Sequence, residues 1–182
     1  MSSSSSSLGI WATIADEAGR ESTLWAAALR PETERDDTPV FSTLAPGRYA
    51  LGLESIYEGY LLHHGRPRLF APADSDTAIL LGDYLYAHGL VRVAAHREVA
   101  VVSDLAELVS LCSQLRAEER DGDGAAWAGT VALLGNGDGR LERARAALRL
   151  HGDPDPLLAV AELEAGLAAV ERALALHAAR LD

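Results

Sequence analysis

Two arginines in the segment HHGRPRLF have the residue type and the spacing for anion binding. Arg66 and Arg68 flank Pro67, whose ring stiffens the chain between them. Two guanidinium groups beside such a turn suit a phosphate or the carboxylate of a partner. A charge pair at the end of a helix is the competing interpretation, because cations also collect there.

Histidines and aspartates between positions 63 and 96 suggest a metal site, but their spacing argues against one. The set is His63, His64, Asp74, Asp76, Asp83, His88 and His96. His63 and His64 are adjacent and would point about 100° apart on a helix, and no HExxH pair is present. Asp36 and Asp37 are adjacent carboxylates in a proline-flanked loop, with no third carboxylate four residues on. We therefore predict no metal and no cofactor.

Two glycine-rich segments, RDGDG at 120–124 and GNGDG at 135–139, are candidates for a calcium loop or a phosphate cradle. Neither has the spaced acidic ligands of a calcium loop or the lysine of a phosphate-binding loop. We predict plain turns at both positions.

The charge of the chain excludes several classes of protein. The 182 residues carry a net charge of −11, and all 16 basic residues are arginine. This acidic balance argues against binding to nucleic acid or to an anionic membrane surface. The single cysteine, Cys112, allows no internal disulfide and fits a reducing cytoplasm.

No apolar stretch reaches the roughly 18 residues of a membrane-spanning helix without meeting a charge. The opening MSSSSSSLGI lacks the basic region and the long apolar region of a secretory signal. We predict a soluble, cytoplasmic protein with no integral membrane segment. It would have a disordered serine-rich tail over 1–7 and a single helical domain over 8–182.

The hydrophobic periods along the chain are helical, without a convincing strand alternation. Helices are expected over about 8–29 with a break near Gly19, and over 47–63, 75–96, 97–120, 125–134, 140–150 and 156–180. The predicted fold class is all-α, a helical bundle of about six or seven helices. The helix over 75–96 is apolar on almost every side, which places it in the middle of the bundle.

Two helices carry amphipathic patterns that suit either the core or a partner surface. The apolar stripe of 97–120 consists of Val101, Leu105, Leu108, Cys112 and Leu115. In 156–180 a heptad-like seam consists of Val160, Leu163, Leu167, Val170, Leu174 and Leu181.

The run LLGDYLYAHGLVRVA, followed by REVAVVSDLAELVSLCSQLRAEE, resembles trans-isoprenyl diphosphate synthases. In that family a helix with a GDYLLARA-like run precedes one that ends in a glutamate- or glutamine-rich turn. The likeness covers about 55–120 and implies an isoprenoid-synthase-like bundle. It also implies that Gly82 and Gly89 let neighbouring helices approach closely. Asp83 would then make a buried hydrogen bond between helices, because an unpaired buried carboxylate is costly.

The chain departs from that family in its chemistry. The two aspartate-rich magnesium motifs are absent, there is no lysine for the diphosphate, and a catalytic subunit is longer. The resemblance therefore implies a non-catalytic relative, similar to the small subunit of heterodimeric long-chain prenyl diphosphate synthases. Such a subunit would support a catalytic partner in making quinone side chains and help shape the wall that limits product length.

Two alternatives remain open. In the first, the chain is a stand-alone helical binding or interaction protein of unknown ligand, as a monomer or a homodimer; in the second, it is an enzyme with an unrecognised site. In the second case Tyr57, Tyr60, Tyr84 and His88 are the first candidates to line an apolar pocket.

Overall fold

A computed structural model describes residues 9–181, and the regular elements among these residues are helices. They form nine α-helices: α1 Ile10–Glu21, α2 Thr23–Ala28, α3 Ala50–His64, α4 Ser75–Ala94, α5 Val99–Ala117, α6 Asp123–Ala132, α7 Arg140–His151, α8 Asp155–Ala165 and α9 Leu167–Leu181. Three short 3-10 helices, Glu32–Glu34, Ser42–Leu44 and Gly47–Tyr49, lie between α2 and α3. The prediction of an all-α fold is confirmed for these residues, whereas the isoprenoid-synthase likeness stays a prediction.

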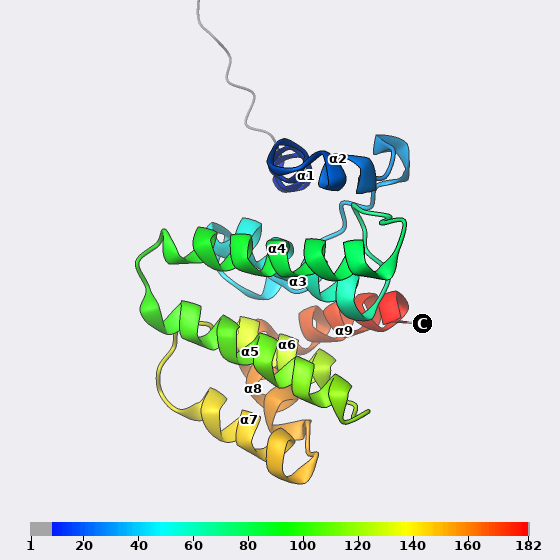
Figure 1. Ribbon diagram of the computed structural model, residues 1–182. Coiled ribbons are helices and arrows are strands. Elements are labelled where there is room, and N and C mark those ends of the chain that lie inside the picture. Colours follow the sequence, from blue (N-terminus) through cyan, green and yellow to red (C-terminus); the bar gives the residue numbers. More distant parts are fainter. Residues whose placement is uncertain (1–8, 182) are drawn as a thin grey trace, which may run out of the picture.

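The helices are arranged in three tiers (Figure 1). α1 and α2 lie at one end, α3 and α4 form a pair beneath them, and α5 to α9 pack on the other side of that pair. Two buried hydrophobic clusters hold the tiers together. The larger joins α3, α5, α6, α7, α8 and α9, and the smaller joins α1 and α2 to α3 and α4. The serine-rich tail predicted for 1–7 lies outside the described residues.

The central helix is α3, not the helix over 75–96 as predicted. Every residue from Gly52 to Leu62 on α3 is buried. Hydropathy alone did not reveal this difference, because α3 carries Glu54 and Glu58, and both carboxylates lie in the core. By contrast, α4 is exposed along one side, where Leu80 keeps 55% and Val91 keeps 67% of their accessible surface.

Glycines bring the backbones of α3 and α4 into close contact. A β-carbon on Gly89 would lie 2.8 Å from the carbonyl oxygen of Gly52, and one on Gly59 would lie 2.8 Å from that of Gly82. Because Gly52 faces Gly89 and Gly59 faces Gly82, the two helices run antiparallel. Asp74 fixes the start of α4 by accepting a hydrogen bond of 2.7 Å from the backbone N–H of Thr77.

The pattern of the helix after α4 agrees with the structure, and that of the last segment does not. All five members of the apolar stripe on α5 are buried. The predicted helix 156–180 is two helices, because Gly166 adopts φ of +87° between α8 and α9. The heptad-like seam is therefore interrupted, and its members Leu163 and Leu167 are exposed. None of the helices within 9–181 is both long and apolar enough to span a membrane.

Substituting Gly89 by alanine tests the close approach of α3 and α4. We expect Gly89→Ala to lower the free energy of unfolding by about 1–3 kcal/mol, because the methyl group overlaps a backbone carbonyl that cannot move aside. Equilibrium urea unfolding measures the change.

The matched control is Gly19→Ala in α1, where the new methyl group would lie 3.6 Å from Leu29 in ordinary contact. Alanine favours a helix over glycine, so this variant should gain up to about 1 kcal/mol. Equal effects at the two positions would contradict the proposed packing.

Candidate functional site

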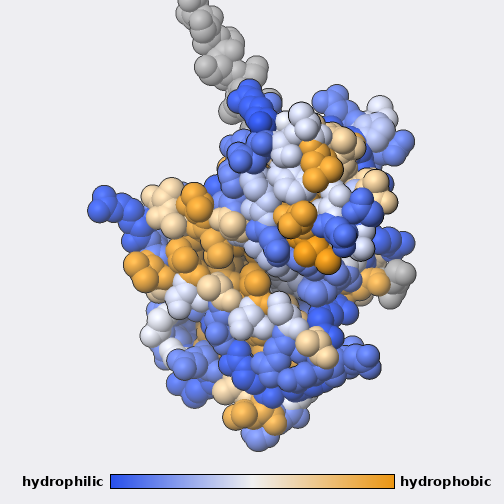
Figure 2. All heavy atoms as spheres, viewed as in Figure 1, coloured by the Kyte–Doolittle hydropathy of each residue, from blue (hydrophilic) through white to orange (hydrophobic). Residues whose placement is uncertain are grey.

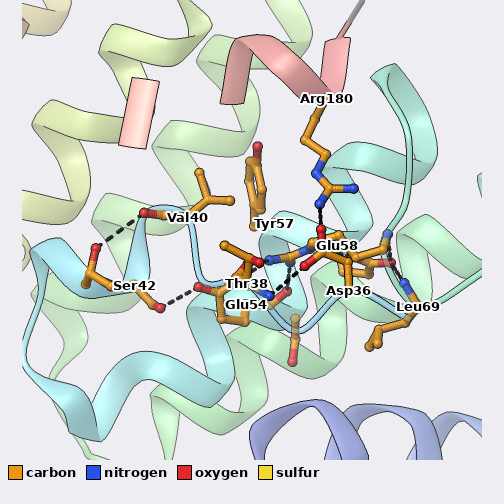
Figure 3. A network of polar contacts seen from close by, with 12 residues as sticks. Asp36, Thr38, Val40, Ser42, Glu54, Tyr57, Glu58, Leu69 and Arg180 are labelled. Atoms are coloured by element: carbon orange, nitrogen blue, oxygen red, sulfur yellow. Dashed lines mark hydrogen bonds and ion pairs between the residues drawn. The ribbon is translucent and has the colours of Figure 1, made fainter. Parts of the chain in front are cut away.

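Three charged side chains meet in the core beside α3. The Arg68 guanidinium donates to Glu54 Oε2 at 2.8 Å and to Glu58 Oε2 at 3.0 Å. The other oxygen of Glu58 accepts the backbone N–H groups of Arg68 at 2.8 Å and Leu69 at 2.7 Å. Each of the three charged side chains is at most 1% exposed. We call this group the ion triad (Figure 3).

The surroundings close the ion triad off from solvent. Ser42 donates its hydroxyl hydrogen to Glu54, and the Thr38 carbonyl accepts from Arg68 at 3.0 Å. The guanidinium carbon of Arg68 lies 4.5 Å from the centre of the Trp11 ring and 5.0 Å from that of Tyr57. Burial alone would lower the pKa of Arg68, but the two carboxylates raise it above its ordinary value. With its polar atoms committed to one another, the ion triad stabilises the fold and leaves no open position for a ligand.

A second buried network lies on the α6 and α9 side of α3. Tyr60 donates its hydroxyl hydrogen to Asp123, which also receives a hydrogen bond from Arg116. The hydroxyl oxygen of Tyr57 lies 2.9 Å from His177 Nδ1, and Nε2 of His177 lies 3.7 Å from Asp123 Oδ1. Burial opposes ionisation of Asp123, but His177, Tyr60 and Arg116 outweigh it and hold the pKa of Asp123 well below its usual value.

The tyrosines of this network are kept neutral by their burial. Burial raises the pKa of both Tyr57 and Tyr60 far above the usual value for tyrosine. His64 lies beside Tyr60, with their ring centres 5.1 Å apart. Burial first, and then the nearby His63 and Arg116, lower the pKa of His64 to about 4. His64 is therefore neutral at pH 7.

The four tyrosine and histidine candidates do not line one pocket. Tyr57 and Tyr60 lie in the larger hydrophobic cluster, whereas Tyr84 packs against the smaller one. The Tyr84 ring lies 6.0 Å from Trp25 of α2 and 4.6 Å from His88. The structure therefore divides the predicted pocket into two separate packing sites.

The remaining predicted residues also separate. Arg68 is buried and paired with two carboxylates, whereas Arg66 is exposed, so the two arginines differ in what they can offer a ligand. Asp83 does contact α3, where it lies 3.2 Å from His63 Nε2. Its side chain is 65% exposed, so the prediction of a buried hydrogen bond was wrong. Gly82 and Gly89 both lie at the close approach of α3 and α4.

The two glycine-rich segments form turns, and their glycines supply the backbone conformations that these turns need. Gly122 adopts φ of +118° and so allows RDGDG to turn into α6, while Gly135, Gly137 and Gly139 adopt positive φ in GNGDG. Among the described residues, no group of three or more histidine, cysteine, aspartate or glutamate side chains is placed to hold a metal ion.

The outward side of α4 is an exposed and mostly apolar surface. We define the α4 face as Ile79, Leu80, Asp83, Ala87 and Val91, all of them exposed. Four of them follow one another at four-residue spacing and so lie along one stripe of the helix. Figure 2 shows hydrophobic residues gathered over α4 and the start of α5. This surface is available for a partner.

Sequence reasoning missed the residues that organise the core, namely Glu54, Glu58, Arg116, Asp123 and His177. The spacing of Glu54 and Glu58, four residues apart in the otherwise apolar run LGLESIYEGYLL, is the signal that points to a buried pair. Comparisons of the chain with protein-family models, with curated proteins and with solved structures gave no match.

Removing Arg68 tests the ion triad. Arg68→Met leaves two buried carboxylates without their cation, and we expect a loss of about 3–5 kcal/mol in the free energy of unfolding. Urea denaturation followed by circular dichroism measures it. The control is Arg20→Met, because Arg20 also pairs with a carboxylate, 3.3 Å from Asp16, but at the surface. That variant should lose less than about 1 kcal/mol. Similar losses in both variants would contradict a stabilising ion triad.

The lowered pKa of His64 predicts a dependence of stability on pH. Between the ordinary pKa of 6.5 and the folded pKa of about 4, the unfolded chain binds more protons at this position than the folded one. The contribution of His64 is thus complete above pH 6.5 and is lost as the pH falls towards 4.

We therefore expect His64→Gln to lose less stability than the wild type when urea unfolding is repeated at pH 5 instead of pH 7. The control is His151→Gln, since His151 is exposed at the end of α7. A histidine NMR signal for residue 64 that titrates near 6.5 would argue against this account.

Proposed function

We propose that this protein is a non-catalytic accessory subunit that docks on a helical polyprenyl diphosphate synthase through the α4 face. The observation that carries the proposal is the exposed, mostly apolar stripe of this helix, in which Ile79 keeps 49% and Val91 67% of their accessible surface and Asp83 is the one charged member. Buried in a partner, such side chains would contribute directly to association.

The position of this stripe on α4 supports the choice of partner. α4 carries the run LLGDYLYAHGLVRVA, which resembles the trans-isoprenyl diphosphate synthases. In that reading the whole chain adopts an isoprenoid-synthase-like bundle, and α4 packs on a corresponding helix of the catalytic subunit. The inward side of α4 is already occupied at Gly82 and Gly89 by α3, so only the α4 face remains for the partner.

The buried networks are consistent with a supporting role. The buried carboxylates of Glu54, Glu58 and Asp123 are each engaged by an arginine. In this proposal they fix the shape of the subunit, and the chemistry takes place on the partner. Because Asp76 and Asp83 are exposed on α4 and the chain is acidic, a partner with basic residues around an apolar patch would fit best.

Co-expression with the polyprenyl diphosphate synthase of the source organism tests the proposal. We expect a complex of one copy of each chain by size-exclusion chromatography with light scattering, and a change in the length of the prenyl product. Val91→Glu should weaken the complex by at least about tenfold, because it places a charge in the apolar interface.

Leu163→Glu is the matched control, because Leu163 is 73% exposed on α8 but lies away from the α4 face. It should leave the complex unchanged. Absence of a complex, or equal weakening by both variants, would contradict the proposal. A homodimer of the chain alone that Val91→Glu dissociates would instead favour the self-associating interaction protein.

A further inference from the structure

Three arginines from distant parts of the sequence meet at one pocket. Arg30 follows α2, Arg66 follows α3, and Arg180 lies in the last turn of α9. They line a pocket of about 290 Å³ together with Glu34 and Asp36, and Arg68 of the ion triad also reaches its wall. We call this the arginine pocket. Such a gathering of cations is unexpected in a chain with a net charge of −11.

Two of these arginines are held in place by the protein. The backbone N–H of Arg66 donates to the carbonyl of Arg180 at 2.9 Å, and its guanidinium donates to that of Ala179 at 2.5 Å. Arg180 pairs with Asp36, and Figure 3 shows the two side chains pointing toward each other. Each guanidinium still has further N–H donors beyond these bonds, since an arginine carries five.

Arg30 is different, because only its backbone is engaged. Its N–H donates to the Leu69 carbonyl at 2.9 Å, and its carbonyl accepts from Arg35 at 2.8 Å. Its guanidinium has no hydrogen bond or ion pair with any residue between 9 and 181. Glu34 lines the same pocket but forms no ion pair with any of the three arginines.

The positive charges of the pocket act on one another. Burial lowers the pKa of Arg180, and the neighbouring charge of Arg30 lowers it further. The charge of Arg68 is already neutralised by Glu54 and Glu58, so Arg68 adds no net positive charge to the pocket. The three remaining guanidiniums outnumber the two carboxylates, and an anion placed among them would relieve their repulsion.

We propose that the arginine pocket binds a small phosphate-type oxyanion, which the unpaired Arg30 guanidinium holds together with the free donors of Arg66 and Arg180. The planar fork of a guanidinium matches two oxygens of a phosphate group, and a pocket of this volume admits a phosphate or a small phosphate monoester. This site is independent of the α4 face and of the accessory role proposed above.

Isothermal titration calorimetry tests the proposal on the full chain with inorganic phosphate and, separately, glycerol 3-phosphate. Ionic strength is kept constant with sodium chloride. We expect saturable binding of at least one of the two, and the tighter one assigns free phosphate or a monoester as the source. Arg30→Gln should weaken that binding by at least about tenfold. The absence of binding to both compounds would overturn the proposal.

The matched control is Arg172→Gln, because Arg172 is an exposed arginine of α9 outside the pocket. It should bind as the wild type does, and equal weakening by both variants would show a general charge effect and overturn the site. In phosphate-free buffer Arg30→Gln should melt at the wild-type temperature or above, because it removes a like charge. If it fails to fold, Arg30→Lys replaces it. This variant keeps the charge but loses the fork, and wild-type affinity in it would also overturn the proposal.

Discussion

The ion triad is the interaction on which the arrangement of the helices depends. α3 is buried on every side, and a helix with carboxylates at Glu54 and Glu58 tolerates that position only if a cation is buried with it. Arg68 supplies the cation from the segment that leaves α3, so the same contact that neutralises the core also fixes where the chain turns toward α4. Trp11 of α1 covers the guanidinium, which connects the first tier to the centre.

α4 packs closely against α3 on one side and also exposes large apolar side chains on the other. Glycines at 82 and 89 bring the backbone of α4 against α3, and Leu81, Leu85 and Val93 are buried on the inward side as well. The large side chains of Ile79, Leu80 and Val91 are instead directed away from the core. A helix that served only the monomer would be stabilised by polar residues at those positions. The glycine contact and the α4 face thus lie on opposite sides of one helix. The exposed apolar side chains of the α4 face favour packing against a second protein.

The sequence predicted where helices form more successfully than it predicted how deeply each helix is buried in the fold. The apolar stripe of α5 follows from local rules and agrees with the structure. The central position of α3 could not be predicted in this way, because hydropathy treats Glu54 and Glu58 as exposed unless a buried partner is known. That partner lies ten or more residues away in a loop. Likewise, the glycines of RDGDG indicate a turn correctly. They do not reveal that the Asp123 carboxylate accepts hydrogen bonds from Tyr60 and Arg116.

Pro67 separates two arginines with opposite roles. Arg68 lies inside the core and is neutralised by two carboxylates, while Arg66 lies outside and caps the carbonyl groups at the end of α9. Since the proline restricts the backbone between them, commitment of Arg68 to the ion triad also fixes the position of Arg66. The arginine pocket is therefore built on the core itself. Arg66 is held by the carbonyl of Ala179 and Arg180 by Asp36, so an anion bound there would meet two guanidinium groups that are already in place.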